Sequence, residues 1–211
     1  MATRGETMHE FVAWPKTTRL FRDIIVTEKL DGTNAAIHIS AFDKRAQSPY
    51  PGTAYTTVVG GTRYIVSAQS RKRIITPGKT TDNFGFAAWV YENAAQLVTL
   101  LGEGLHFGEW WGQGIQRGYA RDLRSFSLFN TERYAGIRET VGTATLGVVP
   151  TLYVGMFSEK AIGTALGNLA ASGSVAAPHF MRPEGICVYH TASRSVSKVT
   201  LDNNDAGKWE A

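Results

Sequence analysis

The chain is poor in cysteine, with Cys187 as the one example among 211 residues. One cysteine cannot form an intramolecular disulfide, and it cannot supply a cysteine-based zinc site. The histidines show no ligand spacing either; they are His9, His38, His106, His179 and His190. The sequence therefore argues against a disulfide scaffold and against a zinc domain.

Long hydrophobic runs are also missing. Residues 1–10 are polar and lack the apolar core of a secretory signal peptide. No apolar stretch approaches the roughly 20 residues that a membrane-spanning helix requires. We expect a soluble, cytoplasmic protein with no membrane partner.

Charged residues are scarce at 19%, whereas hydrophobic residues reach 43% and include 10 Phe, 8 Tyr and 5 Trp. This composition is sufficient for a buried core. The net charge of +4 and the pI near 9.2 suit a nucleic acid or nucleotide partner, although many unrelated proteins carry as much. Without a repeat, a long linker or a break in composition, residues 1–211 are predicted to form one domain.

The pattern of apolar residues predicts an α+β fold with mostly antiparallel sheets. Strands are predicted at 24–30, 35–40, 64–68, 105–110, 125–130, 152–157, 184–190 and 195–201, the last two as a hairpin or an adjacent pair. Helices are predicted at 83–101, begun by Thr81 or Asp82 and ended by Gly102, and at 159–171, begun by Ser158. Residues 42–61 are predicted to form a loop.

The segment Lys29-Leu30-Asp31-Gly32-Thr33-Asn34 carries the first chemical signal. The turn residues Asp31-Gly32-Thr33 would place Lys29 at a bend between two strands. A neutral lysine amine can attack the α-phosphorus of a nucleotide, and Gly32 would let the backbone turn close to a ligand. Asp31 and Asn34 could then order the nucleotide or a metal-bound water. An isolated Lys-x-Asp-Gly is equally compatible with an ordinary turn and a solvated lysine.

Further segments follow in order along the chain. They are Ser70-Arg71 with Lys72 beside it, Phe107-Gly108-Glu109-Trp110-Trp111-Gly112, Ser125-Phe126-Ser127-Leu128-Phe129-Asn130, Pro183-Glu184-Gly185 and Val196-Ser197-Lys198. Together with the Lys29 segment, their order and spacing resemble the covalent nucleotidyltransferases, the superfamily of polynucleotide ligases and capping enzymes. The resemblance is strongest to ATP-dependent RNA ligases and extends from about Trp14 to Leu201.

The resemblance implies a nucleotidyltransferase (ATP-grasp-like) domain of mostly antiparallel sheets flanked by helices, with no OB domain. It implies Lys29 as the nucleophile that takes up AMP, Glu109 as the ligand of the ribose hydroxyls, and an aromatic ring stacked on adenine. Phe126 is preferred for that ring over Phe129, which lies three residues on and so faces the other side of a strand. Glu184 would hold Mg²⁺ or Mn²⁺.

The resemblance further implies that Arg71 contacts phosphate or an RNA end, with Lys72 beside it, and that Lys198 neutralises the α-phosphate. The family usually has a second lysine in the last motif, which this chain lacks. The segment 112–124, with Arg117 and Arg121, is a candidate for gripping RNA, since it mixes cations and aromatic residues.

The implied function is ATP-dependent joining of 5′-phosphate and 3′-hydroxyl RNA ends through a lysyl-AMP intermediate, as in RNA repair. Two alternatives stay open. One is a DNA ligase or a GTP-using capping enzyme, and the other is a nucleotide- or RNA-binding protein without turnover. A homodimer or an accessory protein could supply the binding surface that added domains give to relatives.

Overall fold

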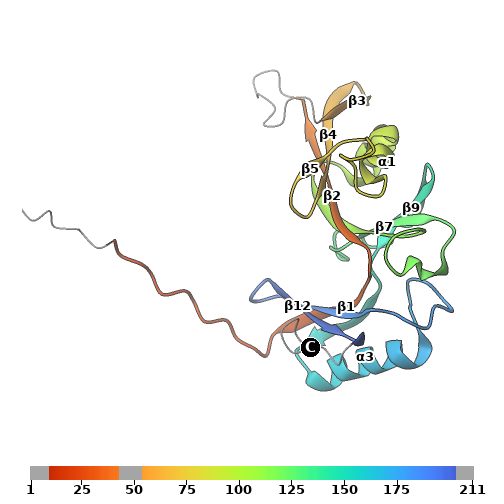
Figure 1. The fold of residues 1–211 in the computed structure, drawn as a ribbon. Coiled ribbons are helices and arrows are strands. Elements are labelled where there is room, and N and C mark those ends of the chain that lie inside the picture. The colour runs from red at the N-terminus through yellow and green to blue at the C-terminus, as the bar shows by residue number, and fades with distance from the viewer. Residues whose placement is uncertain (1–9, 43–53, 203–211) are drawn as a thin grey trace, which may run out of the picture.

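Two β-sheets, each covered on one face by helices, make up the part of the protein that the computed structural model describes, residues 10–42 and 54–202 (Figure 1). The small sheet has the order β10 (Thr151–Met156), β1 (Asp23–Lys29), β11 (Gly185–His190), β12 (Ser195–Thr200). The large sheet has the order β3 (Tyr55–Val59), β4 (Thr62–Ser70), β2 (Thr33–Ala41), β6 (Gly104–Gly112), β7 (Arg124–Leu128), β9 (Ala144–Val148), β8 (Glu139–Val141), and β5 (Ile74–Ile75) pairs with β4.

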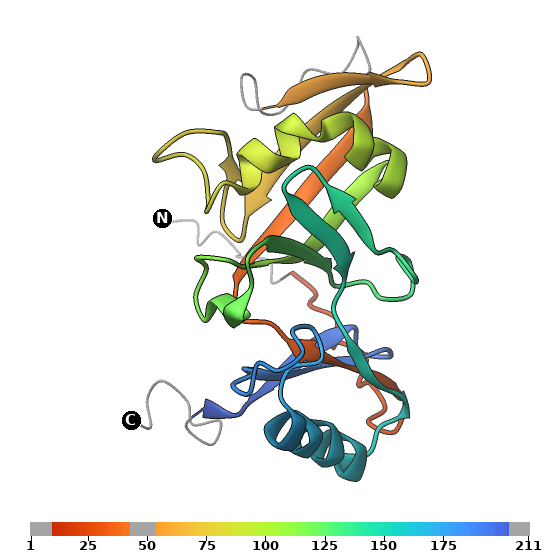
Figure 2. The same ribbon diagram turned by 90° about the vertical axis from the view of Figure 1, so that its right-hand side faces the viewer.

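Helices α1 (Phe86–Glu92) and α2 (Ala94–Leu101) pack on one face of the large sheet (Figure 2). Alternation along the strands turns every second side chain toward them. An aromatic cluster fills the centre, with ring centroids 5.0–6.1 Å apart in the contacting pairs of Phe86, Trp89, Trp110 and Phe126. The other face of the large sheet, which we call its open face, carries no α-helix from the described residues, although the short 3-10 helix η1 (Gly118–Ala120) places Tyr119 against Trp111 there.

The helix predicted at 83–101 is interrupted at Asn93, where the backbone leaves helical geometry and the side-chain amide donates to Trp89 O at 2.8 Å. The helix begins at Phe86, three residues later than predicted, and its N-cap is Gly85 rather than Thr81 or Asp82. The Asp82 carboxylate still accepts from the N–H groups of Ala87 and Ala88 in the first turn. Gly102 ends α2, as predicted.

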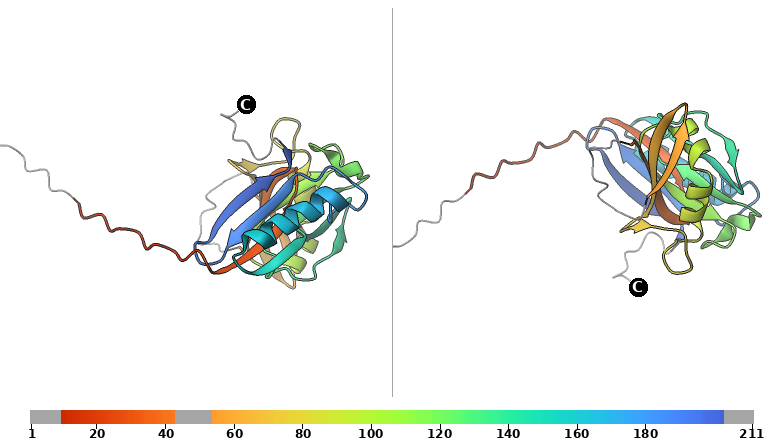
Figure 3. Two further views of the ribbon diagram at one scale, coloured as in Figure 1. Left: turned by 90° about the horizontal axis from the view of Figure 1, so that it is seen from below. Right: turned by 90° about the horizontal axis from the view of Figure 1, so that it is seen from above.

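Helix α3 (Glu159–Ser172) crosses one face of the small sheet (Figure 3). Its first turn is capped by Ser158, whose hydroxyl accepts from the Ala161 N–H at 3.2 Å, as the sequence predicted. Apolar residues of β1 and β11 face the helix and form a second core with two of its residues: Ile24, Val26, Ile186 and Val188 from the strands, and Ala165 and Leu169 from α3. The alternate residues of these strands, including Lys29 and Cys187, therefore point to the other face of the small sheet, away from α3.

Strands β1 and β2 belong to different sheets, so the predicted turn between them is a crossing from one sheet to the other. Strand β1 pairs with β10 and β11, and β2 pairs with β4 and β6. A third, smaller core lies at this crossing, built on Leu30, Trp111, Tyr119, Val149 and Ala177.

The expected fold class is confirmed: the described residues form an α+β structure with antiparallel pairing, except for the parallel pair β7–β9. All eight predicted strands are present within a few residues, and β11 and β12 are adjacent, as expected. The loop predicted at 42–61 is wrong for residues 55–59, which form strand β3, and its residues 43–53 lie outside the described ranges. Strands β5, β8 and β9 were not predicted. Every described strand belongs to the two sheets, and no OB domain is present among them.

No helix within the described ranges is both long enough and apolar enough to cross a membrane.

A buried histidine gives the large sheet a pH-dependent stability. His106 is fully buried, with Nδ1 2.5 Å from the Tyr134 hydroxyl and Nε2 3.0 Å from Gly102 O. Burial lowers its pKa to about 4, with the charge of Arg133 acting in the same direction. The folded state therefore holds the imidazole neutral over a pH range in which the unfolded chain protonates it.

We expect this histidine alone to lower the free energy of unfolding by about 2 kcal/mol between pH 7 and pH 5. Urea unfolding of the wild type and of His106→Gln at both pH values measures the contribution. The wild type should lose more stability on acidification than the variant. Equal losses would contradict the prediction.

Candidate functional site

Lys29 is the last residue of β1 and lies opposite Gly185 of β11. Its Nζ is 2.5 Å from Oε2 of Glu184, and both side chains are partly exposed. That carboxylate oxygen is buried and has no hydrogen-bond partner among the described residues, so the ion pair with Lys29 is its main interaction. The pair brings together the residues predicted as nucleophile and metal ligand.

Glu28, the neighbour of Lys29, is a site residue that the sequence did not reveal. Its side chain is buried and accepts hydrogen bonds from the Ser174 hydroxyl at 2.5 Å and from the Val175 and Ala176 N–H groups, both at 2.9 Å. Burial raises the pKa of Glu28, and these three hydrogen bonds oppose the rise. The carboxylate thus fastens the loop after α3 beneath the end of β1.

Glu109 of β6 lies opposite Asn34 of β2, on the open face of the large sheet. The N–H of Gly32 donates to its carboxylate. A Cβ at position 32 would lie 2.4 Å from Trp110 O, so only glycine allows this approach to β6. Burial raises the pKa of Glu109 to about 7, while the charge of Lys29 opposes the rise.

Cys187 lies among the charged side chains of both sheets. Burial raises the pKa of its thiol, which is also influenced by the charges of Lys29, Glu184, Glu109 and Lys198. Lys198 is the direct cross-strand neighbour of Cys187 and is exposed on β12. We call Lys29, Glu109, Glu184, Cys187 and Lys198 the Lys29 site.

The place of the second family lysine, two residues before Lys198, holds Val196. It lies on the same face of β12 and its side chain is 64% exposed. Arg194 is held in the turn before β12 with φ 54°. No described contact joins Arg194 to the Lys29 site.

Asp31 is held by two residues of the segment 112–124. The Arg117 Nε donates to its Oδ2 at 2.8 Å, and its own N–H donates to the Tyr119 hydroxyl at 2.8 Å. Asp31 therefore has partners within the protein at both its backbone and its side chain.

The preference for Phe126 as the stacking ring does not agree with the structure. Phe126 is fully buried in the core under α1 and lies opposite Trp110. Glu109 instead lies opposite Ser127, so Glu109 and Phe126 are on opposite faces of the large sheet. Phe129 follows β7, and its N–H donates to Phe107 O, which continues the pairing of β7 with β6 by one residue. Its side chain lies on the same face of the large sheet as Glu109, and the residue is 40% exposed.

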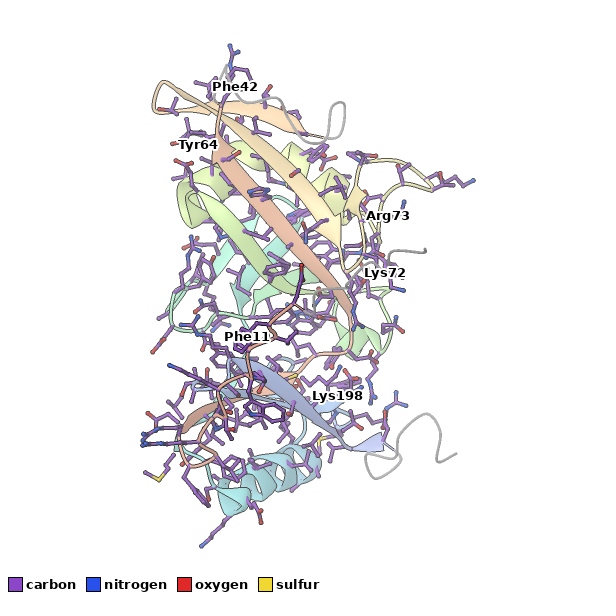
Figure 4. The ribbon with its side chains drawn as sticks, turned by 90° about the vertical axis from the view of Figure 1, so that its left-hand side faces the viewer. Phe11, Phe42, Tyr64, Lys72, Arg73 and Lys198 are labelled. Carbon is purple, nitrogen blue, oxygen red and sulfur yellow. The ribbon has the colours of Figure 1, made fainter. Side chains whose placement is uncertain are left out.

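No described contact joins Arg71, Lys72 or Arg121 to the Lys29 site. Arg71 and Lys72 lie in the exposed turn between β4 and β5, which begins where Ser70 pairs with Ala35 at the start of β2. Figure 4 shows Lys72 on the same flank of the molecule as Lys198. The guanidinium carbon of Arg121 lies over the Trp111 ring, 5.0 Å from its centroid.

Metal binding would depend mainly on Glu184. Within residues 10–42 and 54–202, no three acidic, histidine or cysteine side chains come together as a complete metal site. One carboxylate whose buried oxygen lacks a hydrogen bond fits an ion such as Mg²⁺, which keeps several waters and takes further oxygens from phosphates.

Comparison with known proteins identifies the family. The sequence model of the RNA ligase family matches residues 22–208. The chain, with a lysine and two glutamates at the junction of its two sheets, therefore belongs to the RNA ligase family. The expected nucleotidyltransferase fold class agrees with this membership.

Two similar solved structures come from Naegleria gruberi. One is an apo mutant of RNA ligase R4a, with 14% identity, a TM-score of 0.44, and coverage of 84% of this chain and 49% of that one. The other is an RNA ligase mutant with ATP and Mn, with 13% identity, a TM-score of 0.46, and coverage of 87% and 51%. The chain thus spans about half the length of these proteins. No curated protein matches the chain.

The electrostatics of the site can be tested without a ligand. We expect the Glu109 carboxyl to titrate near pH 7 in ¹³C NMR of glutamate-labelled protein, because burial raises its pKa. In Lys29→Met the midpoint should rise further, since the charge that opposes the shift is gone. Lys160→Met, on the exposed side of α3, should leave it unchanged. An unchanged or lower midpoint in Lys29→Met would contradict the assignment.

Proposed function

We propose that the protein is an ATP-dependent RNA ligase that works through a lysyl-AMP intermediate on Lys29. The observation that carries the proposal is the convergence of Lys29, Glu109, Glu184 and Lys198 on one site in a chain of the RNA ligase family. The two sheets together act as one adenylyltransferase domain, since Lys29 and Glu184 come from the small sheet and Glu109 from the large one.

The first step is attack of the Lys29 amine on the α-phosphorus of ATP. A nitrogen–phosphorus bond forms, the bond between the α-phosphorus and the bridging oxygen breaks, pyrophosphate leaves, and the amine loses its proton to solvent. Lys29 must leave its ion pair with Glu184 before this step, because an ammonium has no lone pair. The pair is thus the resting arrangement of the nucleophile.

The neighbouring side chains bind and neutralise the nucleotide. Glu109 has Asn34 opposite it and Gly32 beside it, and its carboxylate accepts hydrogen bonds from the hydroxyl groups of the ribose. Lys198 places a positive charge at the α-phosphate, which favours the departure of pyrophosphate. Glu184 would hold Mg²⁺ or Mn²⁺, and such an ion would neutralise phosphate charge. ATP and Mn accompany one of the Naegleria mutants, which supports the choice of both ligands.

Phe129 is the candidate for stacking on adenine. It lies on the same face as Glu109, its ring is partly exposed, and Phe107 lies beside it. An exposed aromatic ring offers a stacking surface for a base, whereas a ring inside a packed core does not. The role expected for Phe126 therefore passes to Phe129 in this proposal.

The later steps act on RNA. AMP passes from Lys29 to a 5′-phosphate, and a 3′-hydroxyl then attacks that phosphate and releases AMP. The exposed Arg71 and Lys72 are suited to bind phosphates of the RNA ends, because guanidinium and ammonium groups bind phosphate oxygens. RNA repair, a cytoplasmic location, and a homodimer or accessory protein remain predictions.

Labelling with α-³²P-ATP tests the central claim. We expect wild-type protein to take up AMP, seen also as an AMP-sized increase in mass, and Lys29→Ala to lose the label completely. Lys160→Ala, exposed on α3, is the matched control and should label fully.

Label retained in Lys29→Ala would overturn the assignment of the nucleophile. Preference for GTP would favour a capping enzyme, sealing of nicked DNA alone would favour a DNA ligase, and absence of label in the wild type would favour a binding protein without turnover.

The two phenylalanines should behave differently. We expect Phe129→Ala to raise the KM for ATP in AMP transfer by about tenfold, with little change in stability, because stacking on a base is worth roughly 1–3 kcal/mol. Phe126→Ala should instead lower the free energy of unfolding by about 3–5 kcal/mol, as loss of a large core side chain does. A Phe129→Ala enzyme with unchanged KM would remove that residue from the site.

A further inference from the structure

The loop between β6 and β7 reaches across to the small sheet through Arg117. Its Nε donates to Asp31 Oδ2 at 2.8 Å, its Nη1 donates to Arg182 O at 3.1 Å, and its Nη2 bonds to the carboxylate of Asp202. Three parts of the chain that are far apart in sequence thus meet at one guanidinium. A planar guanidinium suits this task, because its donors have fixed directions.

Tyr119 adds a second contact from the same loop. Its hydroxyl accepts the Asp31 N–H at 2.8 Å, and its ring is buried between Trp111 and Phe180, with centroids 5.0 and 4.7 Å away. Burial raises the pKa of Tyr119, so the phenol remains neutral. The backbone and the side chain of Asp31 are therefore both held by this loop.

The loop adopts its shape against the preferences of its backbone. Gln116, Tyr119 and Ala120 have φ values of 45°, 53° and 51°, a region that non-glycine residues rarely occupy. Such conformations persist only where surrounding contacts fix them. Here the buried Tyr119 ring and the bonds of Arg117 supply those contacts.

We propose that Arg117 and Tyr119 are positioning residues for the nucleophile, and we call them the Asp31 clamp. Asp31 is two residues after Lys29, Arg182 is two before Glu184, and Asp202 is four after Lys198. The clamp therefore fixes the Lys29 segment relative to the strands that carry Glu184 and Lys198. It holds the large and small sheets in the arrangement that brings Glu109 close to Lys29. This inference rests on the proposed function.

The clamp gives Arg117 a different role from the RNA contact that the sequence predicted. Its guanidinium already binds two carboxylates and a carbonyl, and its side chain is 20% exposed. An RNA phosphate would have to displace Asp31 or Asp202. The role of Arg117 should therefore appear before any RNA is present.

AMP transfer from ATP to Lys29, measured without RNA, tests the clamp. We expect Arg117→Ala to slow the single-turnover rate by about 10- to 100-fold with a smaller change in the apparent affinity for ATP, as misplacement of a reacting group does. Arg117→Lys should recover part of the rate. Asp31→Asn should be slow as well, and the double variant no slower than the worse single one.

Arg124→Ala is the matched control, because Arg124 lies at the end of the same loop but donates to the carbonyls of Phe84 and Gln113. It should transfer AMP at the wild-type rate. Normal transfer by Arg117→Ala, together with weaker RNA binding and a lower salt dependence, would overturn the clamp in favour of an RNA contact.

Hydrogen exchange provides a readout that does not require activity. In Tyr119→Phe and in Arg117→Ala, the Asp31 amide should exchange at least tenfold faster than in wild type, while amides in α3 remain protected. If wild type takes up no AMP but these amides respond as expected, the proposed function fails and the clamp stands. Unchanged exchange at Asp31 in both variants overturns the clamp even in an active enzyme.

Discussion

The arrangement of the site depends on the short passage of the chain from the small sheet to the large one. Only Leu30, Asp31 and Gly32 separate the end of β1 from the start of β2. Leu30 is buried in the third core, Asp31 is bound by Arg117 and Tyr119, and Gly32 lies against β6. Because each of the three is held in a different way, the position of Lys29 relative to Glu109 follows from packing as well as from chain connectivity.

Because side chains along β1 point alternately to the two faces of the small sheet, neighbouring residues of this strand have different roles. Glu28 and Lys29 point to opposite faces, so one carboxylate is used to fasten the loop after α3 and the next side chain is left for chemistry. Their electrostatics differ accordingly. Glu28 has three donors that compensate its burial, whereas the half-buried Glu109 has one backbone donor, from Gly32, and the nearby Lys29 charge. A carboxylate with so few hydrogen-bond donors is suited to accept hydrogen bonds from the hydroxyl groups of a ligand.

The sequence predicted eight of the twelve described strands, because alternation is a local signal, and its motifs, by their resemblance to those of RNA ligases, nominated most of the candidate site. It placed Lys29, Glu109, Glu184 and Lys198 without knowledge of the fold. It could not tell which of Phe126 and Phe129 is buried, since that depends on which face of the sheet the helices cover. It did not reveal the bond from Arg117 to Asp31, because the two residues are 86 positions apart in the sequence. The break at Asn93 was invisible because the apolar spacing continues across it.

The single thiol of the chain has a practical consequence. Cys187 is close enough to Lys29, Glu109, Glu184 and Lys198 for their charges to act on its thiol, so a probe attached through sulfur reports from the candidate site without engineered cysteines. Burial raises its pKa, so attachment is slow at neutral pH and faster in alkaline buffer. A bound nucleotide would shield the same sulfur, which makes its rate of alkylation a direct measure of whether the site is occupied.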